Sequence, residues 1–261
     1  MNGSVTPEVD WRLGIVLAIL VLVGVVASRL GRLDVGRDTV VSSLRAALQL
    51  AVVALVITAA LESLWGSALF AAVMLVVASW TAAGRMGVPR RGPEQVVLVG
   101  VALGAGALPV VALILGSGVI PFNGPGLVPT AGIIIGNTMT AAVLAGRRAF
   151  DELERSFGAY EAGLAIGLTS PVSSFEVLQP SAKEALSPGL DKTRTVGLVT
   201  LPGAFVGVLL GGGTPLEAGA AQLLVLVGLV AAQAITATVL LRQIAQARLV
   251  RSTLADRYPN G

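Results

Sequence analysis

The sequence predicts an all-α, polytopic membrane protein with about seven transmembrane helices and a helical cytoplasmic coupling loop between spans five and six. Two observations indicate this class. Of the 261 residues, 54% are hydrophobic and only 13% are charged, whereas roughly a quarter of an ordinary soluble domain is charged. The apolar residues also form runs of about 20, the length that crosses roughly 30 Å of hydrocarbon. We therefore expect a single transmembrane domain over residues 1–261.

Seven apolar runs define the expected spans. The first is the shortest, but Trp11 suits the membrane interface at one end and Arg29 can reach the interface at the other. The segment "MNGSVTPEVD" before it contains no basic residue, so we expect a retained helix and not a signal peptide. The expected spans are 12–28, 44–61, 65–83, 96–116, 127–146, 195–212 and 218–241.

The basic residues fix the expected orientation. All of the 18 Lys and Arg residues except Arg12 fall in one set of alternate loops, and the other loops contain none. We expect a multi-pass protein of the cytoplasmic (inner) membrane. By the positive-inside rule, its N-terminus is expected on the outside of this membrane and its C-terminus in the cytoplasm. The basic character therefore reports topology, and nucleic-acid binding is not expected.

The longest break between spans is the expected cytoplasmic loop, residues 147–194. It opens with Phe150, Leu153 and Phe157 at helical spacing opposite a charged face, which predicts an amphipathic helix continuing out of the fifth span. A second short helix, roughly 172–186, is expected after Gly167, because capping residues and Pro171 precede it. A loop that only joined two spans would not need this length.

Within this loop a spaced motif stands out. Its residues are Glu161, Ala162, Gly163, then Gly167 after three residues, then Val177 and Pro180 after nine more. The spacing resembles the docking loop of permeases from ATP-binding cassette (ABC) importers: Glu-Ala-Ala, three residues, Gly, nine residues, Ile, any residue, Leu, Pro. Gly163, Val177 and Gln179 depart from that pattern. The resemblance implies that this loop is an ATPase-coupling site.

Two longer segments carry a more specific resemblance: "ALSPGLDKTRTVGLVTLPGAFVGVLLGGGTPLEAGAAQ" and "LVPTAGIIIGNTM" at 127–139. With them the chain resembles the FetB-type ABC transporter permease family, which includes bacterial iron exporters and plant aluminium-tolerance permeases. The resemblance covers about Arg45 to the seventh span. It implies the transmembrane subunit of an ABC transporter, in which two permeases pair with two cytosolic ATPase subunits.

No Gly-x-x-x-x-Gly-Lys-[Ser/Thr] phosphate-binding loop occurs in the chain, so we expect ATP and Mg²⁺ to be bound by a separate ATPase and no cofactor to be bound here. The chain also has no Cys and no His. Without them, enzymatic activity that needs a Cys nucleophile or a His base is excluded, and no metal site is expected.

Polar residues within the spans are candidates for a substrate path, because each must find a partner or line water. Hydrogen bonding between helices is the alternative explanation for each of them. The candidates are Gln49, Asn137, Thr138, Thr140, Thr200, Pro202, Gln222 and Gln233. Small-residue faces predict close helix packing, either within the bundle or against a second permease. They are formed by Gly132 and Gly136 in span five and by Gly203, Gly207 and Gly211 in span six.

The residues of the spans do not identify the transported solute. The resembled family indicates iron export, yet the spans hold no carboxylate, imidazole or thiolate for a bare ion. A chelated or otherwise metal-related solute, an organic anion or another small solute is therefore expected. The alternative functions are a membrane scaffold or an ion-coupled secondary transporter without an ATPase partner. The latter normally needs an intramembrane acid or base.

Overall fold

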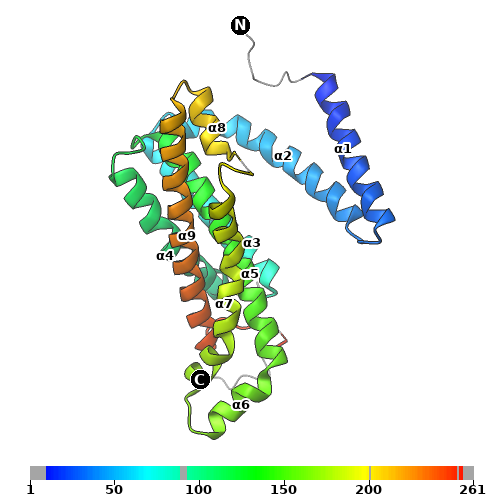
Figure 1. Ribbon diagram of the computed structural model, residues 1–261, viewed down its shortest axis with the longest axis vertical. Coiled ribbons are helices and arrows are strands. Elements are labelled where there is room, and N and C mark those ends of the chain that lie inside the picture. Colours follow the sequence, from blue (N-terminus) through cyan, green and yellow to red (C-terminus); the bar gives the residue numbers. More distant parts are fainter. Residues whose placement is uncertain (1–9, 89–92, 200, 252, 255–261) are drawn as a thin grey trace. The chain divides into compact units, whose positions relative to one another are not determined.

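The structure, a computed structural model, describes residues 10–88, 93–199, 201–251 and 253–254 (Figure 1). Every regular element in this described part is an α-helix, which confirms the predicted class. The chain divides into two compact units, Met1–Ala59 and Ala60–Gly261. Six helices, α1 to α5 and α9, are long and apolar enough to cross a membrane. The chain is thus a multi-pass membrane protein.

The first unit is a helical hairpin of α1 (Trp11–Leu30) and most of α2 (Gly36–Leu61). α1 begins where the Asp10 carboxylate accepts hydrogen bonds from the backbone N–H groups of Arg12 and Leu13. Ser28 is the only buried residue of α1, and most apolar side chains of this helix are exposed, whereas Val21 and Val25 are partly covered. Such a helix is suited to lipid, which solvates apolar surface on all sides.

The second unit is built around α5 (Gly124–Arg155), which packs against α3 (Leu64–Met86), α4 (Pro93–Gly116) and α9 (Pro215–Ala245). The sequence sets the starts of these helices. The side chains of Ser63 and Asn123 cap α3 and α5, and Thr214 forms a capping box with Glu217 at the start of α9. Each cap satisfies N–H groups that have no partner within the helix. All four helices begin within a few residues of the predicted span starts, and α3, α4 and α9 also end close to the predicted ends.

Two helices follow α5: α6 (Phe157–Ala165) and α7 (Ser170–Thr195). As predicted, α5 continues past its span, to Arg155. α7 is much longer than the short helix expected over roughly 172–186, and it packs along both α5 and α9 (Figure 1). The expected loop 147–194 is therefore largely a helical hairpin whose second arm returns beside the spans.

The predicted sixth span, 195–212, does not form a single helix. α7 ends at Thr195, and the next helix, α8 (Gly203–Leu210), has only eight residues. Gly197 takes a left-handed backbone conformation with φ of +80°, and Pro202 stands immediately before α8. Left-handed φ interrupts a right-handed helix, and Pro lacks the N–H that would continue one. The segment predicted as the sixth span is thus interrupted between α7 and α8, and neither helix is among the six that are long and apolar enough to cross a membrane.

Candidate functional site

The α6–α7 hairpin is held by a close contact at Gly163. A Cβ on Gly163 would overlap Ser173 Oγ and would lie 3.0 Å from Ser173 Cβ, so only glycine lets the two helices approach this closely. Ser173 Oγ donates to the carbonyl oxygen of Tyr160 at 2.7 Å, and Tyr160 Oη lies 3.0 Å from Ser170 Oγ. Gly163, Ser173 and Tyr160 are all buried. The hairpin is therefore a packed unit.

The turn of the hairpin presents an apolar tip. Gly167 has φ of +94°, which L side chains rarely adopt, and no atom lies within 4 Å of where its Cβ would be. Beside it, Ile166 is 81% exposed, and Glu161 and Ala162 of α6 are also exposed. The tip is defined as the exposed apolar residues Leu164, Ile166, Leu168, Val172 and Phe175. A groove of about 410 Å³ between the start of α7 and the end of α9 adjoins it.

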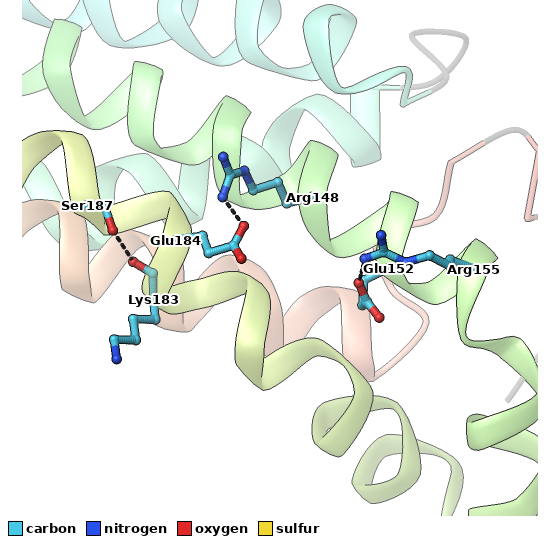
Figure 2. A network of polar contacts seen from close by, with 6 residues as sticks. All are labelled: Arg148, Glu152, Arg155, Lys183, Glu184 and Ser187. Atoms are coloured by element: carbon cyan, nitrogen blue, oxygen red, sulfur yellow. Dashed lines mark hydrogen bonds and ion pairs between the residues drawn. The ribbon is translucent and has the colours of Figure 1, made fainter.

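The remaining motif residues lie further along α7. Val177 packs, partly buried, against the hydrophobic core. Pro180 is exposed and lines a groove between α5 and α7, where Arg148 of α5 and Glu184 of α7 form an ion pair. Figure 2 shows this pair bridging the two helices, beside the Glu152–Arg155 pair within α5. The motif thus spans from the tip to an exposed ion pair between α5 and α7.

A polar cluster lies where α5, α7 and α9 meet. Asn137 Oδ1 accepts a hydrogen bond from Lys192 Nζ at 3.1 Å, and the backbone carbonyl of Asn137 accepts one from Gln233 Nε2 at 3.3 Å. A Cβ at Gly189 would overlap Gln233 Oε1, so this glycine makes room for the amide. The structure therefore brings together two predicted path residues, Asn137 and Gln233. It adds Lys192, which the sequence placed in the cytoplasmic loop.

A small cavity of about 250 Å³ lies at the break between α7 and α8. It is lined by Pro202 and by Gln222, whose side chain is buried and whose Oε1 has no hydrogen-bond partner among the described residues. Discontinuous helices in transporters often mark binding sites, because the free backbone groups at a break can coordinate a solute. Two of the predicted path residues, Pro202 and Gln222, therefore lie together at the break between α7 and α8.

The other predicted path residues are elsewhere. Thr138 is fully buried and donates to the carbonyl of Ile134 at 2.6 Å, whereas Thr140 is exposed and donates to Gly136. Gln49 is exposed on α2 in the first unit. Thr200 lies outside the described residues. The hydroxyl of Thr138 thus has its hydrogen-bond partner within its own helix, which does not indicate a role in a substrate path.

The glycine faces are mostly open within the chain. Gly132 packs against Met74 of α3, with 3.0 Å between its would-be Cβ and Met74 Cε. Gly136, Gly203 and Gly207 have no neighbour within 4 Å of that position, and Gly211 meets only backbone of its own helix end. α8 contains no buried residue. Gly132 thus packs within the bundle, whereas the described residues leave Gly136, Gly203 and Gly207 uncovered. Packing of these three glycines against a second permease stays a prediction.

Sequence reasoning missed three contributors. Lys192 was assigned to the loop because the α7 segment is polar. Ser173 was expected only as a possible cap of the second helix, but it lies inside α7 and bonds to the carbonyl of Tyr160. Arg251 was counted only as a topological charge, but its guanidinium donates to Met86 O at 3.2 Å and to Asp151 Oδ1 at 2.6 Å. It thereby ties the chain after α9 to the ends of α3 and α5. Among the described residues, no group of three or more Cys, Asp or Glu side chains could hold a metal ion.

These elements define a polytopic α-helical membrane protein whose larger unit carries a packed helical hairpin at one end and a broken helix at the other. Comparison with known families matches residues 11–249 to the "Uncharacterised protein family (UPF0014)". The chain belongs to this family, which agrees with the resemblance identified from its motifs. No solved structure matches the chain significantly.

Several characterised or named relatives are similar over much of the chain. "Protein ALUMINUM SENSITIVE 3" of Arabidopsis thaliana is 31% identical over 227 residues, 85% of this chain and 82% of the relative. "UPF0014 membrane protein STAR2" of Oryza sativa subsp. japonica is 34% identical over 153 residues, 59% and 53% of the two chains. The "Probable iron export permease protein FetB" of Escherichia coli (strain K12) is 33% identical over 129 residues, 48% of each chain.

Proposed function

We propose that this protein is the permease subunit of an ATP-driven ABC transporter and that the α6–α7 hairpin receives the ATPase. The observation that carries the proposal is the exposed apolar tip on a hairpin fixed by the Gly163–Ser173 contact. A rigid projection can transmit force, and an exposed apolar patch is typical of a protein-binding surface. The name of one relative, an iron export permease, supports the same class.

The hairpin end of the second unit is proposed to face the cytoplasm. Arg251 bonds to Met86 and Asp151, so the ends of α3, α5 and α9 meet at the end where α6 begins. Arg85, Arg148 and Arg155 lie at this end too. Excess basic residues at one set of helix ends favour the cytoplasmic side. A cytosolic ATPase, binding ATP and Mg²⁺, would meet the hairpin there.

A second copy of the permease is proposed to cover the open faces of α5 and α8. Among the described residues, no atom outside the local helix backbone lies within 4 Å of where a Cβ on Gly136, Gly203 or Gly207 would be. Small residues at helical spacing let two helices approach closely in lipid, where van der Waals contact drives association. The full transporter would then contain two permeases and two ATPase subunits.

The cargo is proposed to be a small solute that carries anionic groups, such as a metal in a chelated form, moved in the export direction. Lys192 supports this because its ammonium, held by Asn137, stands exposed at the level of the middle of the predicted fifth span. A cation there attracts anionic groups strongly, since little water screens it. The relatives' names, which refer to iron export and to aluminium sensitivity, support a metal-related solute.

The docking proposal is tested by co-purification of the permease with its cognate ATPase. Gly167→Trp and Glu161→Lys are expected to abolish the association while the permease still reaches the membrane. Each has a matched control. Gly118→Trp alters another left-handed glycine, φ +75°, with open space around it, and Glu62→Lys alters another exposed acid. Unchanged co-purification of both hairpin variants would overturn the proposal.

The cargo proposal is tested by cargo-stimulated ATP hydrolysis in vesicles that contain both subunits. Lys192→Gln should lower the stimulation by roughly 10- to 150-fold, because a charge-assisted hydrogen bond is worth about 1.5–3 kcal/mol. Lys183→Gln, which removes the other lysine of α7, should leave it unchanged. Equal stimulation in the two variants would contradict a role for Lys192. Hydrolysis that no solute stimulates would instead favour a scaffold.

A further inference from the structure

Three arginines converge on one cavity at the turn of the first unit. The cavity measures about 550 Å³ and is lined by Arg29 at the end of α1, Arg32 in the turn and Arg37 in the first turn of α2. All three side chains are exposed, so a ligand can reach them. The size falls within the range of roughly 300–1,000 Å³ that is usual for small-molecule sites.

The charges in this cavity are not balanced within the chain. None of the three arginines forms an ion pair with a described carboxylate. Asp34 is the one acid that lines the cavity. Arg37 is the second residue of α2, where the positive end of the helix dipole disfavours a cation. With Asp34 in the lining and Asp38 in the first turn of α2, the segment still carries an excess of positive charge.

The turn is also conformationally specified. Arg32 and Asp34 have φ of +51° and +53°, a left-handed conformation that costs free energy in residues other than glycine. The buried Ser28 stabilises it, since its Oγ accepts a hydrogen bond from the N–H of Val35 at 3.1 Å. A turn fixed in this way keeps Arg32 in the same cavity lining as the other two arginines.

We propose that this cavity binds a phosphate group. The planar guanidinium donates two parallel hydrogen bonds to phosphate oxygens, and the three arginines together with Asp34 give a lining whose positive charge matches a phosphomonoester and exceeds that of a phosphodiester. The turn lies at the end of two helices of span length, which is the level of lipid headgroups. The phosphate can therefore come from an anionic phospholipid or from a soluble phosphate compound.

The test uses the full chain in nanodiscs, with the melting temperature as the readout. In phosphatidylcholine nanodiscs, inorganic phosphate and glycerol 3-phosphate are titrated, and separately phosphatidylglycerol is mixed into the bilayer. A saturable rise in melting temperature with phosphatidylglycerol alone identifies the lipid as the source. A rise with the soluble probes identifies a soluble phosphate. No saturable rise of the wild type with any probe overturns the proposal.

The variant is the triple substitution Arg29→Gln, Arg32→Gln and Arg37→Gln. Its control, Arg85→Gln, Arg147→Gln and Arg248→Gln, removes the same charge from exposed arginines that form no ion pair with a described carboxylate. Apparent affinity should fall at least about tenfold in the first and stay unchanged in the second. Equal loss in both would show an effect of net charge and would overturn the site. If the first triple fails to fold, Arg37→Gln alone is measured under the same criterion.

Discussion

Gly163→Ala should loosen the α6–α7 hairpin without altering the membrane-spanning bundle. The new Cβ would overlap Ser173 Oγ and lie 3.0 Å from Ser173 Cβ. Because Ser173 Oγ is itself held by the carbonyl of Tyr160, it cannot rotate away without losing a buried hydrogen bond. Overpacking of this kind costs about 1–3 kcal/mol. Opening of the hairpin should therefore become roughly 5- to 150-fold more frequent.

Hydrogen exchange of the backbone amides measures this opening. Amides over residues 157–176 should exchange roughly 5- to 150-fold faster in Gly163→Ala, while amides of α3 and α4 keep their rates. Gly158→Ala is the matched control, since it adds the same methyl to α6 at a position with nothing within 4 Å. It should be neutral or slightly stabilising, because Ala favours helix over Gly.

Adding Ser173→Ala to Gly163→Ala should recover part of the lost protection, because the overlapping oxygen is removed. The two substitutions should thus show a coupling of about 0.5–3 kcal/mol in a double-mutant cycle. Unchanged exchange in Gly163→Ala, or effects that simply add in the double variant, would refute the close contact as the feature that holds the hairpin.

Three further substitutions test other contacts. Gly106→Ala should destabilise the bundle by about 3 kcal/mol or more, because its Cβ would overlap Thr236 Oγ1 and the backbone oxygen of Ala232, whereas Gly104→Ala in the same helix should not. Thermal unfolding in detergent compares the pair, and equal melting temperatures would contradict the packing. Arg251→Gln should cost about 1.5–3 kcal/mol by removing charge-assisted bonds from a side chain only 17% exposed. The C-terminal end should then be cleaved faster in limited proteolysis. Unchanged cleavage would argue against a stabilising role of the Arg251 bonds to Met86 and Asp151.

The spanning helices could be predicted well because lipid imposes a simple rule. A run of about 20 apolar residues satisfies its backbone internally as a helix, so composition fixes the class and the approximate bounds. The caps at Asn123 and Thr214 were not used, and the predicted spans begin three residues late at both sites. Hydropathy reports only the apolar part of a helix, and the first turn of each of these helices extends beyond that part.

α7 could not be predicted from hydropathy, because its polar segment lies against protein and not against lipid. Its buried residues are small except for Leu178, and they include Ser174, Ser181 and Ala185. They pack on α5 and α9, a contact between segments far apart in the sequence. Lys192 was therefore assigned to a cytoplasmic loop, although it reaches Asn137. Tertiary packing, which no local pattern records, decides this part of the site.

The spacing of the docking motif was informative for a reason that the structure makes plain. Gly163 departs from the Ala of the resembled motif, yet a Cβ at that position would overlap Ser173. Gly167 stands where the chain must take a left-handed φ to reverse direction. The two glycines thus serve different physical needs, close approach and chain reversal.

Cross-linking of the hairpin to the ATPase tests the central proposal most directly. The chain has no cysteine, so a single introduced thiol carries a photoreactive probe at one known position. Ile166→Cys places it on the tip, at a side chain 81% exposed, and Val119→Cys places it after α4 at one 62% exposed. The account predicts a permease–ATPase cross-link from position 166 and none from 119. No cross-link from 166 in a complex that hydrolyses ATP, or an equal yield from both positions, would contradict it.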